Sequence, residues 1–220
     1  MPSAPIWQIV LRLVGTAVVA YLIGSTPSGV LVGKVFGNVD PREHGSGKTG
    51  ATNILRTLGP GAAVAVGITD LLKGVVPVLL ARYLLFPPGA AWDNLRLWGE
   101  VIAGFGALFG HNYSVFIHFQ GGRGVATGGG SMFAINPLTG LFGALGFIIP
   151  IATTRYVSLG SIVASASAAV AEAVLVATGH DRYQHLIFIA GGAAFIIFSH
   201  RDNIDRLLKG TERKLGDKAR

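Results

Sequence analysis

The chain has 220 residues, of which 50% are hydrophobic and 13% charged, and its mean hydropathy is +0.55. An ordinary soluble domain carries roughly 25% charged residues, so this composition excludes a soluble globular protein and predicts one all-α integral membrane domain over residues 1–220. The chain has no cysteine, which excludes a disulfide framework, a thiolate nucleophile and a cysteine-based zinc site.

Seven apolar segments approach the roughly 20 residues that a helix needs to cross a bilayer. The first lacks a basic start and is longer than the roughly 7–15 apolar residues of a signal peptide, so we expect a retained transmembrane helix. The fourth and fifth are short and meet at Asn136-Pro137, which leaves one re-entrant hairpin as an alternative. The seven predicted spans are Ile6–Phe36, Gly61–Phe86, Leu95–Phe119, Gly124–Ile135, Leu138–Thr153, Val157–Thr178 and His185–Ser199.

Lysine and arginine gather on one side of this arrangement. Thirteen lie there, seven of them in the tail after the last span, against three on the other side. By the positive-inside rule, the C-terminus is expected in the cytoplasm and the N-terminus outside. These bases occupy gaps between apolar runs and form no soluble face with interleaved aromatics, so nucleic acid is not an expected partner.

The polar stretch Gly45–Gly59 stands out beside the apolar runs. Its Gly-Ser-Gly-Lys-Thr run suggests a nucleotide-binding P-loop, but that motif needs a glycine five positions before Gly47, where this chain has Arg42. It also needs a preceding strand in a parallel sheet. A P-loop is therefore not expected.

A glycine-rich turn that leads into a helix directs free N–H groups at an anion, and the helix dipole favours negative charge there. With a helix starting near Ala51, Asn53 and Arg56 share one face. We therefore expect Ser46, Asn53 and Arg56 to surround one phosphate. A capped interfacial helix with a solvated arginine is the alternative.

A second glycine-rich loop resembles another oxyanion site. Its glycines allow the backbone to approach a ligand closely, and its arginine can donate two hydrogen bonds to a phosphate. A flexible turn between membrane helices is the alternative, and His111 and His118 before the loop are either structural residues or proton carriers. The candidate binding residues of this loop are Gly121, Gly122, Arg123, Gly124 and Thr127.

Ionisable residues inside apolar segments are costly and are usually paired or functional. Asp70 and Lys73 are three residues apart in the second segment and are interpreted as a structural pair that holds two helices together. Glu172 lies alone in the sixth segment, and the sequence does not identify its partner. No spacing of His, Asp and Glu indicates a metal site.

Two more polar clusters follow the fifth and the seventh predicted spans. Ser158 and Ser161 begin a predicted helix, where N-capping alone would explain them. In the tail, His200, Asn203 and Arg206 form the polar side of a helix expected to end near a C-cap at Gly210. An amphipathic basic helix on anionic lipid is the alternative for this tail.

All four clusters are expected on one membrane face. An enzyme that handles two phosphorylated molecules at the membrane explains them together. A membrane carrier for organic phosphate anions, which would use the same basic loops without chemistry, is the alternative from another class. Inverted repeats of the kind that transporters show are not apparent in the sequence.

The residues above also carry a resemblance: over nearly its full length the chain resembles the bacterial acyl-phosphate:glycerol-3-phosphate acyltransferases (PlsY type). The matching segments occur in family order and at family-like spacing. They are Gly24–Gly29, Gly45–Arg56, Asp70–Gly74, Gly110–Thr127, Arg155–Ser161 and His200–Glu212.

The resemblance implies a seven-helix membrane fold with a cytoplasmic active site in the bacterial inner membrane. It implies transfer of an acyl group from acyl phosphate to sn-glycerol 3-phosphate, giving 1-acyl-glycerol 3-phosphate (lysophosphatidic acid) and phosphate for phospholipid synthesis. No cofactor is implied, and neither coenzyme A nor acyl carrier protein is used directly.

By position, the resemblance implies that Ser46 and Arg56 bind glycerol 3-phosphate and that Gly121–Thr127 forms the acyl-phosphate loop. His200 and Asn203 match tail residues that line the site, so His200, Ser46 and Asn203 are the catalytic candidates. Ser158 and Glu212 are further binding candidates. The chain departs from the family pattern at four positions, namely Lys48, Ser114, Gln120 and Arg123.

His200 and Asp205 also form the His-x4-Asp spacing of coenzyme-A-dependent glycerolipid acyltransferases. Five helical steps place two residues about 140° apart on a helix, and the surrounding sequence does not resemble that family. Coenzyme-A-dependent transfer at His200 and Asp205 is thus not expected, and it is kept as the enzymatic alternative.

Overall fold

A computed structural model describes residues 5–89 and 92–217. All regular structure within these ranges is helical, as predicted. The α-helices are α1 (Ile6–Gly24), α2 (Ser28–Gly37), α3 (Ala51–Leu58), α4 (Pro60–Leu80), α5 (Asp93–Asn112), α6 (Val125–Ile135), α7 (Pro137–Thr154), α8 (Val157–Ala177), α9 (Tyr183–Ser199) and α10 (Arg201–Leu208). Short turns of helix are η1 (Pro41–Glu43), η2 (Ala81–Leu85) and η3 (Val115–Ile117).

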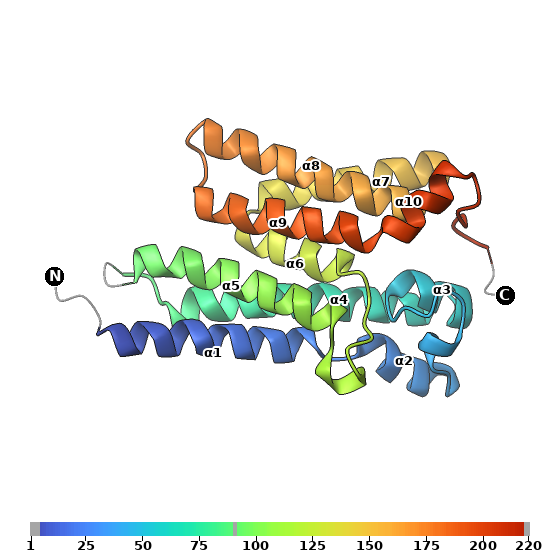
Figure 1. Cartoon of the computed structure of the whole chain (residues 1–220), viewed down its shortest axis with the longest axis horizontal. Helices are drawn as coiled ribbons and strands as arrows, with labels where there is room; N and C mark the ends of the chain where they lie inside the picture. The colour runs from blue at the N-terminus through green and yellow to red at the C-terminus, as the bar shows by residue number, and fades with distance from the viewer. Residues whose placement is uncertain (1–4, 90–91, 218–220) are drawn as a thin grey trace.

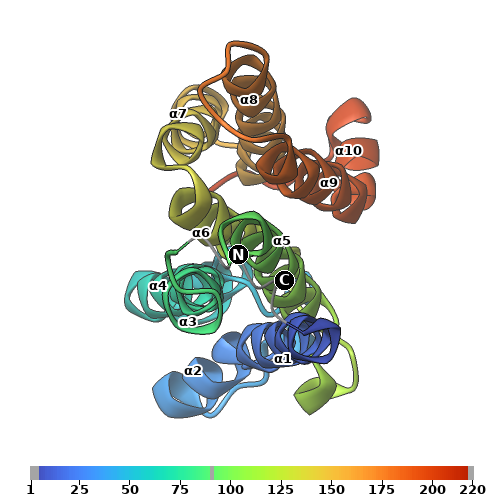
Figure 2. The ribbon, with the colours of Figure 1, turned by 90° about the vertical axis from the view of Figure 1, so that its left-hand side faces the viewer.

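The long helices lie roughly parallel to one axis (Figure 1). Viewed from the end, α7, α8 and α9 form one group, α4, α5 and α6 lie in the middle, and α1 and α2 lie on the other side (Figure 2). The short helices α2, α3 and α10 gather at one end of the bundle (Figure 1). The start of α1 and the α8–α9 turn lie at the other end. The bundle therefore has two distinct ends.

Length and hydropathy identify four helical segments that could span a membrane: Ile6–Gly37, Pro60–Leu85, Pro137–Thr154 and Val157–Ala177. A fifth is obtained when α9 and α10, bent by 58° against each other, are taken as one broken span. The remaining predicted spans are less apolar or shorter, since α5 begins with Asp93, Arg96 and Glu100 and α6 has 11 residues. The membrane fold is thus supported, while the count of seven spans and the orientation of the termini stay predictions.

The first predicted span is not one continuous helix, because α1 ends at Gly24 and α2 begins at Ser28. Lys73 Nζ on α4 donates to the Thr26 carbonyl in this break at 2.9 Å and lies 3.0 Å from Asp70 Oδ1. Ser28 Oγ donates to the same Asp70 carboxylate. The predicted Asp70–Lys73 pair is therefore confirmed, and it holds the broken end of α1 and the start of α2 against α4.

The boundary between α6 and α7 lies where the sequence places it. Asn136 caps α7, since its Oδ1 accepts hydrogen bonds from Leu138 N at 3.0 Å and Thr139 N at 3.3 Å. Pro137 occupies the first helical position, where a missing N–H has no intrahelical partner to lose. The third predicted span, in contrast, ends early: α5 stops at Asn112, and residues 113–124 form a loop that contains η3.

Candidate functional site

A cavity of about 340 Å³ opens between α3, the loop before α6, the start of α8 and α10. Its mouth is polar and lies at the end of the bundle where α2, α3 and α10 gather (Figure 1). Its inner wall is apolar and includes Leu71, Met132, Phe147, Ala164 and Ile196 from five different helices. The cavity can therefore take a molecule with a charged head and an apolar chain.

Asn53 holds the loop that precedes α3. Its Oδ1 accepts from Ser46 N at 2.9 Å, and its Nδ2 lies within 3.0 Å of the carbonyl oxygens of Pro41, His44 and Lys48. The side chain is 2% exposed. Asn53 thus lines the cavity as expected, but its amide is used to shape the loop around Ser46.

Lys48, Arg56 and Arg123 place three cations on the cavity wall. None of them forms an ion pair within residues 5–89 and 92–217. Burial, reinforced by neighbouring cations, lowers the pKa of each of the three groups. Arg123 Nε is buried and lacks a hydrogen-bond partner in this structure. An anion in the cavity would stabilise the charged form of these groups.

The glycine loop before α6 packs tightly on the end of α5. Gly121 N and Gly122 N donate to the carbonyls of Asn112 and His111 at 3.1 and 3.2 Å. A Cβ on Gly121 would lie 1.9 Å from the His111 carbonyl oxygen, and one on Gly122 would lie 2.0 Å from His111 Nε2. These two glycines therefore allow close packing that fixes Arg123 at the cavity, and they do not line it themselves.

Glu212 connects the tail to two other elements. Its Oε1 accepts from Ser158 Oγ on α8 at 2.9 Å and from Asn203 Nδ2 on α10 at 2.7 Å. Its Oε2 accepts from Arg206 Nε at 2.7 Å. Burial raises the pKa of Glu212, but the hydrogen bonds from Asn203, Arg206 and Ser158 outweigh it and hold the pKa below its usual value. The carboxylate is therefore ionised at neutral pH and closes one side of the cavity.

His200 lies at the bend between α9 and α10, with its Nδ1 2.8 Å from the Ile196 carbonyl. This contact assigns the proton to Nδ1 and leaves the lone pair on Nε2. Burial lowers the pKa of His200 to about 4, so the ring is neutral at pH 7. Asp205, the second residue of the His-x4-Asp spacing, instead pairs with Lys209 at 2.9 Å on the exposed side of α10.

Most of the predicted site residues meet at this one cavity. Those that line it are Ser46, Asn53, Arg56, Arg123, Gly124, Ser158, His200, Asn203 and Glu212. Gly121 and Gly122 lie behind it, and Thr127 on α6 is wholly buried, with no hydrogen-bond partner for its Oγ1 within the described part of the chain. These three residues are not among those that line the cavity, so their expected contact with a ligand stays a prediction.

The cavity also includes residues whose part in a site the sequence did not assign. Lys48 and His111 are polar residues of the two glycine-rich segments in the sequence, and the fold brings both to the cavity wall. Ser161 and Ser165 follow Ser158 on the inner face of α8. Their spacing of three and seven residues from Ser158 is the signal that could have identified this face.

Comparison with known proteins identifies one family. A family model described as "Glycerol-3-phosphate acyltransferase" matches residues 14–210. Relatives called glycerol-3-phosphate acyltransferase in Thermoanaerobacter sp. and Synechococcus elongatus are 42% and 40% identical, and the alignments cover 92% and 96% of this chain and 96% and 98% of those proteins.

Two solved structures are also similar, both of PlsY (YgiH), an integral membrane glycerol 3-phosphate acyltransferase. The glycerol 3-phosphate form superposes with a TM-score of 0.80 at 37% identity, covering 93% of this chain and 96% of that one. The lysophosphatidic acid form gives 0.79 at 36% identity, with 93% and 95% covered.

Proposed function

The chain belongs to the glycerol-3-phosphate acyltransferase family, and on this premise we propose that it transfers a fatty acyl group from acyl phosphate to sn-glycerol 3-phosphate. The products are 1-acyl-glycerol 3-phosphate (lysophosphatidic acid) and inorganic phosphate. The observation that carries the proposal is a set of three cations at the mouth of a cavity with an apolar interior, Lys48, Arg56 and Arg123, none of which forms an ion pair with another described residue. Both proposed substrates are phosphorylated, and the donor also carries an acyl chain.

We assign the two phosphates to the two loops. Ser46 and Arg56 bind glycerol 3-phosphate, with Asn53 holding the backbone of the loop in place. Arg123, with Gly124 beside it, binds the acyl phosphate, whose chain lies along the apolar wall of α6, α7 and α8. Glu212, Asn203 and Ser158 form the side of the cavity contributed by the tail.

Acyl phosphate is already activated, so the protein needs to bring the reactants together and to neutralise charge. The glycerol hydroxyl oxygen attacks the carbonyl carbon and forms the ester bond. The bond from that carbon to the phosphate oxygen breaks, and the phosphate leaves with the electron pair. The hydroxyl proton goes to a phosphate oxygen, so that atoms and charge balance without a covalent intermediate on the protein.

His200 assists this transfer mainly by position. With a pKa of about 4, its neutral ring is a weaker base than a phosphate monoester, whose second pKa is about 6. Nε2 is available to accept a hydrogen bond from the glycerol hydroxyl and to orient it. A phosphate oxygen is then the final proton acceptor. Asn203 has a buried Oδ1 without a partner, which can hold a second substrate hydroxyl.

The same proposal places the protein in the bacterial inner membrane with the cavity open to the cytoplasm. The basic loops Gly45–Gly59 and Gly121–Thr127 and the basic tail lie at one end of the bundle, which supports a cytoplasmic position for that end. Both substrates are then available from the cytoplasmic side, and the product remains in the membrane.

A donor-resolved assay tests the reaction. Purified protein is given glycerol 3-phosphate with acyl phosphate, acyl coenzyme A or acyl carrier protein, and both phosphate and lysophosphatidic acid are measured. We expect equimolar products from acyl phosphate alone. A carrier for organic phosphate anions would release neither product, and activity with acyl coenzyme A would support the alternative enzyme. Trapping an acyl group on Ser46 would refute direct transfer.

A further inference from the structure

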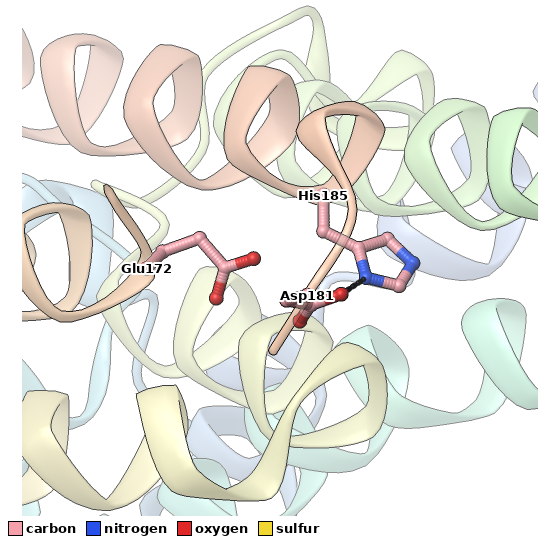
Figure 3. A group of neighbouring side chains, drawn as sticks. All are labelled: Glu172, Asp181 and His185. Atoms are coloured by element: carbon pink, nitrogen blue, oxygen red, sulfur yellow. Dashed lines mark hydrogen bonds and ion pairs between the residues drawn. The ribbon is translucent and has the colours of Figure 1, made fainter. Parts of the chain in front are cut away.

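We propose that Glu172, Asp181 and His185 form a binding site for one divalent transition-metal ion such as Zn²⁺, at the end of the bundle opposite the catalytic cavity. The ligand atoms that the three side chains offer all lie within 4.8 Å of one another. The residues come from α8, the α8–α9 turn and the start of α9 (Figure 3). Spacing along the sequence gave no indication of this site, because the turn between the helices brings the residues together.

Glu172 is the residue that most needs a further partner. Its side chain is wholly buried, and Thr139 Oγ1 on α7 donates to Oε2 at 2.6 Å. Its other oxygen, Oε1, has no hydrogen-bond partner among the residues that the structure describes. A buried polar atom without a partner lowers stability, and more so when it is charged. Figure 3 shows this carboxylate pointing toward Asp181 and His185.

The other two ligands are already oriented by their neighbours. His185 Nδ1 lies 2.7 Å from Asp181 Oδ1, and Asn136 Nδ2 at the start of α7 donates to Asp181 Oδ2. The His185 side chain is 8% exposed and that of Asp181 is 11% exposed. An ion that enters between the three residues replaces the direct contact between Asp181 and His185.

The local charges favour a cation. Two carboxylates face a single imidazole, and the nearby guanidinium of Arg82 is occupied, since its Nε and Nη2 bind the Glu100 carboxylate at 2.9 and 2.7 Å. His185 Nε2 lies 3.2 Å from Glu100 Oε2, so the ring is held between two acidic neighbours. The group therefore has more negative than positive charge, and a divalent ion would balance it.

The ligand types favour a particular class of ion. Two carboxylates and one imidazole suit Zn²⁺, Co²⁺ or Mn²⁺, whereas Mg²⁺ and Ca²⁺ prefer six or more oxygen ligands. Three protein ligands leave a position for water. The exposed residues His180 and Arg182 lie beside Asp181, so the turn provides a route from solvent. The bound ion would tie α8 to α9 and, through Thr139 and Asn136, to the start of α7.

The full chain, purified in detergent and stripped with a chelator, provides the test. Titration with Co²⁺ is followed by visible absorption, and Zn²⁺ is then added as a competitor. We expect one Co²⁺ per chain, displaced by Zn²⁺. At Zn²⁺ concentrations 100-fold above the dissociation constant, the thermal midpoint should rise by about 5–10 °C.

Matched variants show where the ion binds. Glu172→Gln and His185→Gln should abolish both the Co²⁺ spectrum and the Zn²⁺ shift, whereas His180→Gln, an exposed histidine of the same turn, should keep both. Glu172→Gln retains an acceptor for Thr139 and leaves the distant catalytic cavity intact, so acyl transfer activity reports that the variant has folded. Loss of binding in His180→Gln with retention in His185→Gln would overturn the proposal.

A second outcome also overturns it. If the carboxyl groups of Glu172 and Asp181 share a proton in place of an ion, the stripped protein would show no Zn²⁺ shift. Glu172→Gln would then raise the thermal midpoint of the metal-free protein. Because acyl transfer is measured separately, failure of this proposal is distinguishable from failure of the proposed reaction.

Discussion

Ser158 Oγ donates a hydrogen bond of 2.9 Å to the carboxylate of Glu212, although 54 residues separate them in the chain. The bond joins the first turn of α8 to the segment after α10. Asn203 and Arg206 bind the same carboxylate, so the tail is attached to the bundle at one buried charge. One wall of the cavity therefore depends on a residue that lies beyond the last long helix.

Replacing Glu212 with Gln should weaken this wall. The amide keeps one acceptor oxygen but loses the charge that binds Arg206, and hydrogen bonds to charged groups contribute about 1.5–3 kcal/mol each. We expect kcat/KM for acyl transfer to fall about tenfold or more. Asp205→Asn on the exposed side of α10 is the control and should retain parental activity. Equal losses in the two variants would contradict a specific role for Glu212 and would revive the His200–Asp205 pair.

Arg56 should act mainly on the acceptor substrate. Arg56→Ala is expected to raise the KM for glycerol 3-phosphate about 10- to 100-fold, because one charge-assisted phosphate contact is lost. Arg56→Lys should recover part of the loss, since it keeps the charge without the two-pronged geometry. Steady-state kinetics at varied acceptor concentration measure the effect.

The matched control for Arg56 is Arg42→Ala. Arg42 lies in the same loop region but binds Asp40 at 2.6 Å and does not line the cavity. The KM of the Arg42→Ala variant for glycerol 3-phosphate should stay near the parental value. Near-parental kinetics in Arg56→Ala would remove Arg56 from the acceptor site.

Asn53 should matter for stability as well as activity. Asn53→Ala removes hydrogen bonds to four backbone groups and takes away the side-chain partner of Ser46 N and of the Lys48 carbonyl, so we expect a loss of about 2–4 kcal/mol in the free energy of unfolding. Thermal unfolding in detergent measures it, with the exposed Asn94→Ala as control. A variant with parental stability but no activity would instead indicate that Asn53 contacts the substrate directly.

Burial of His200 should make the free energy of unfolding depend on pH. Its pKa is about 4 in the folded protein and about 6.5 when unfolded, so the unfolded chain binds more protons between these values. Stability is therefore fully present above about pH 6.5 and falls as the pH drops toward 4, by at most about 3 kcal/mol. As the pH falls from about 6.5 to 4, the unfolding midpoint of the parent should fall further than that of His200→Gln. Parallel curves would contradict a buried neutral ring.

Local patterns in the sequence predicted much of the fold. The start of α3 at Ala51 and the break at Asn136-Pro137 follow from backbone constraints within a few residues, so they were predictable. The interruption of the first span between Gly24 and Ser28 was not, because it depends on Lys73 and Asp70 of another helix. Apolarity alone does not distinguish a continuous helix from two helices joined by a stabilised break.

The sequence by itself determined the class of the protein, the distribution of its charged residues and the list of candidate site residues, since composition, charge distribution and motif spacing are properties of the chain. Only the tertiary structure decided which of those residues meet. It used Asn53 to shape a loop and packed Gly121 and Gly122 against His111. It also placed Glu172 beside Asp181 and His185. These relationships arise from helix packing between distant segments, where a buried charge or donor must find a partner that no local pattern encodes.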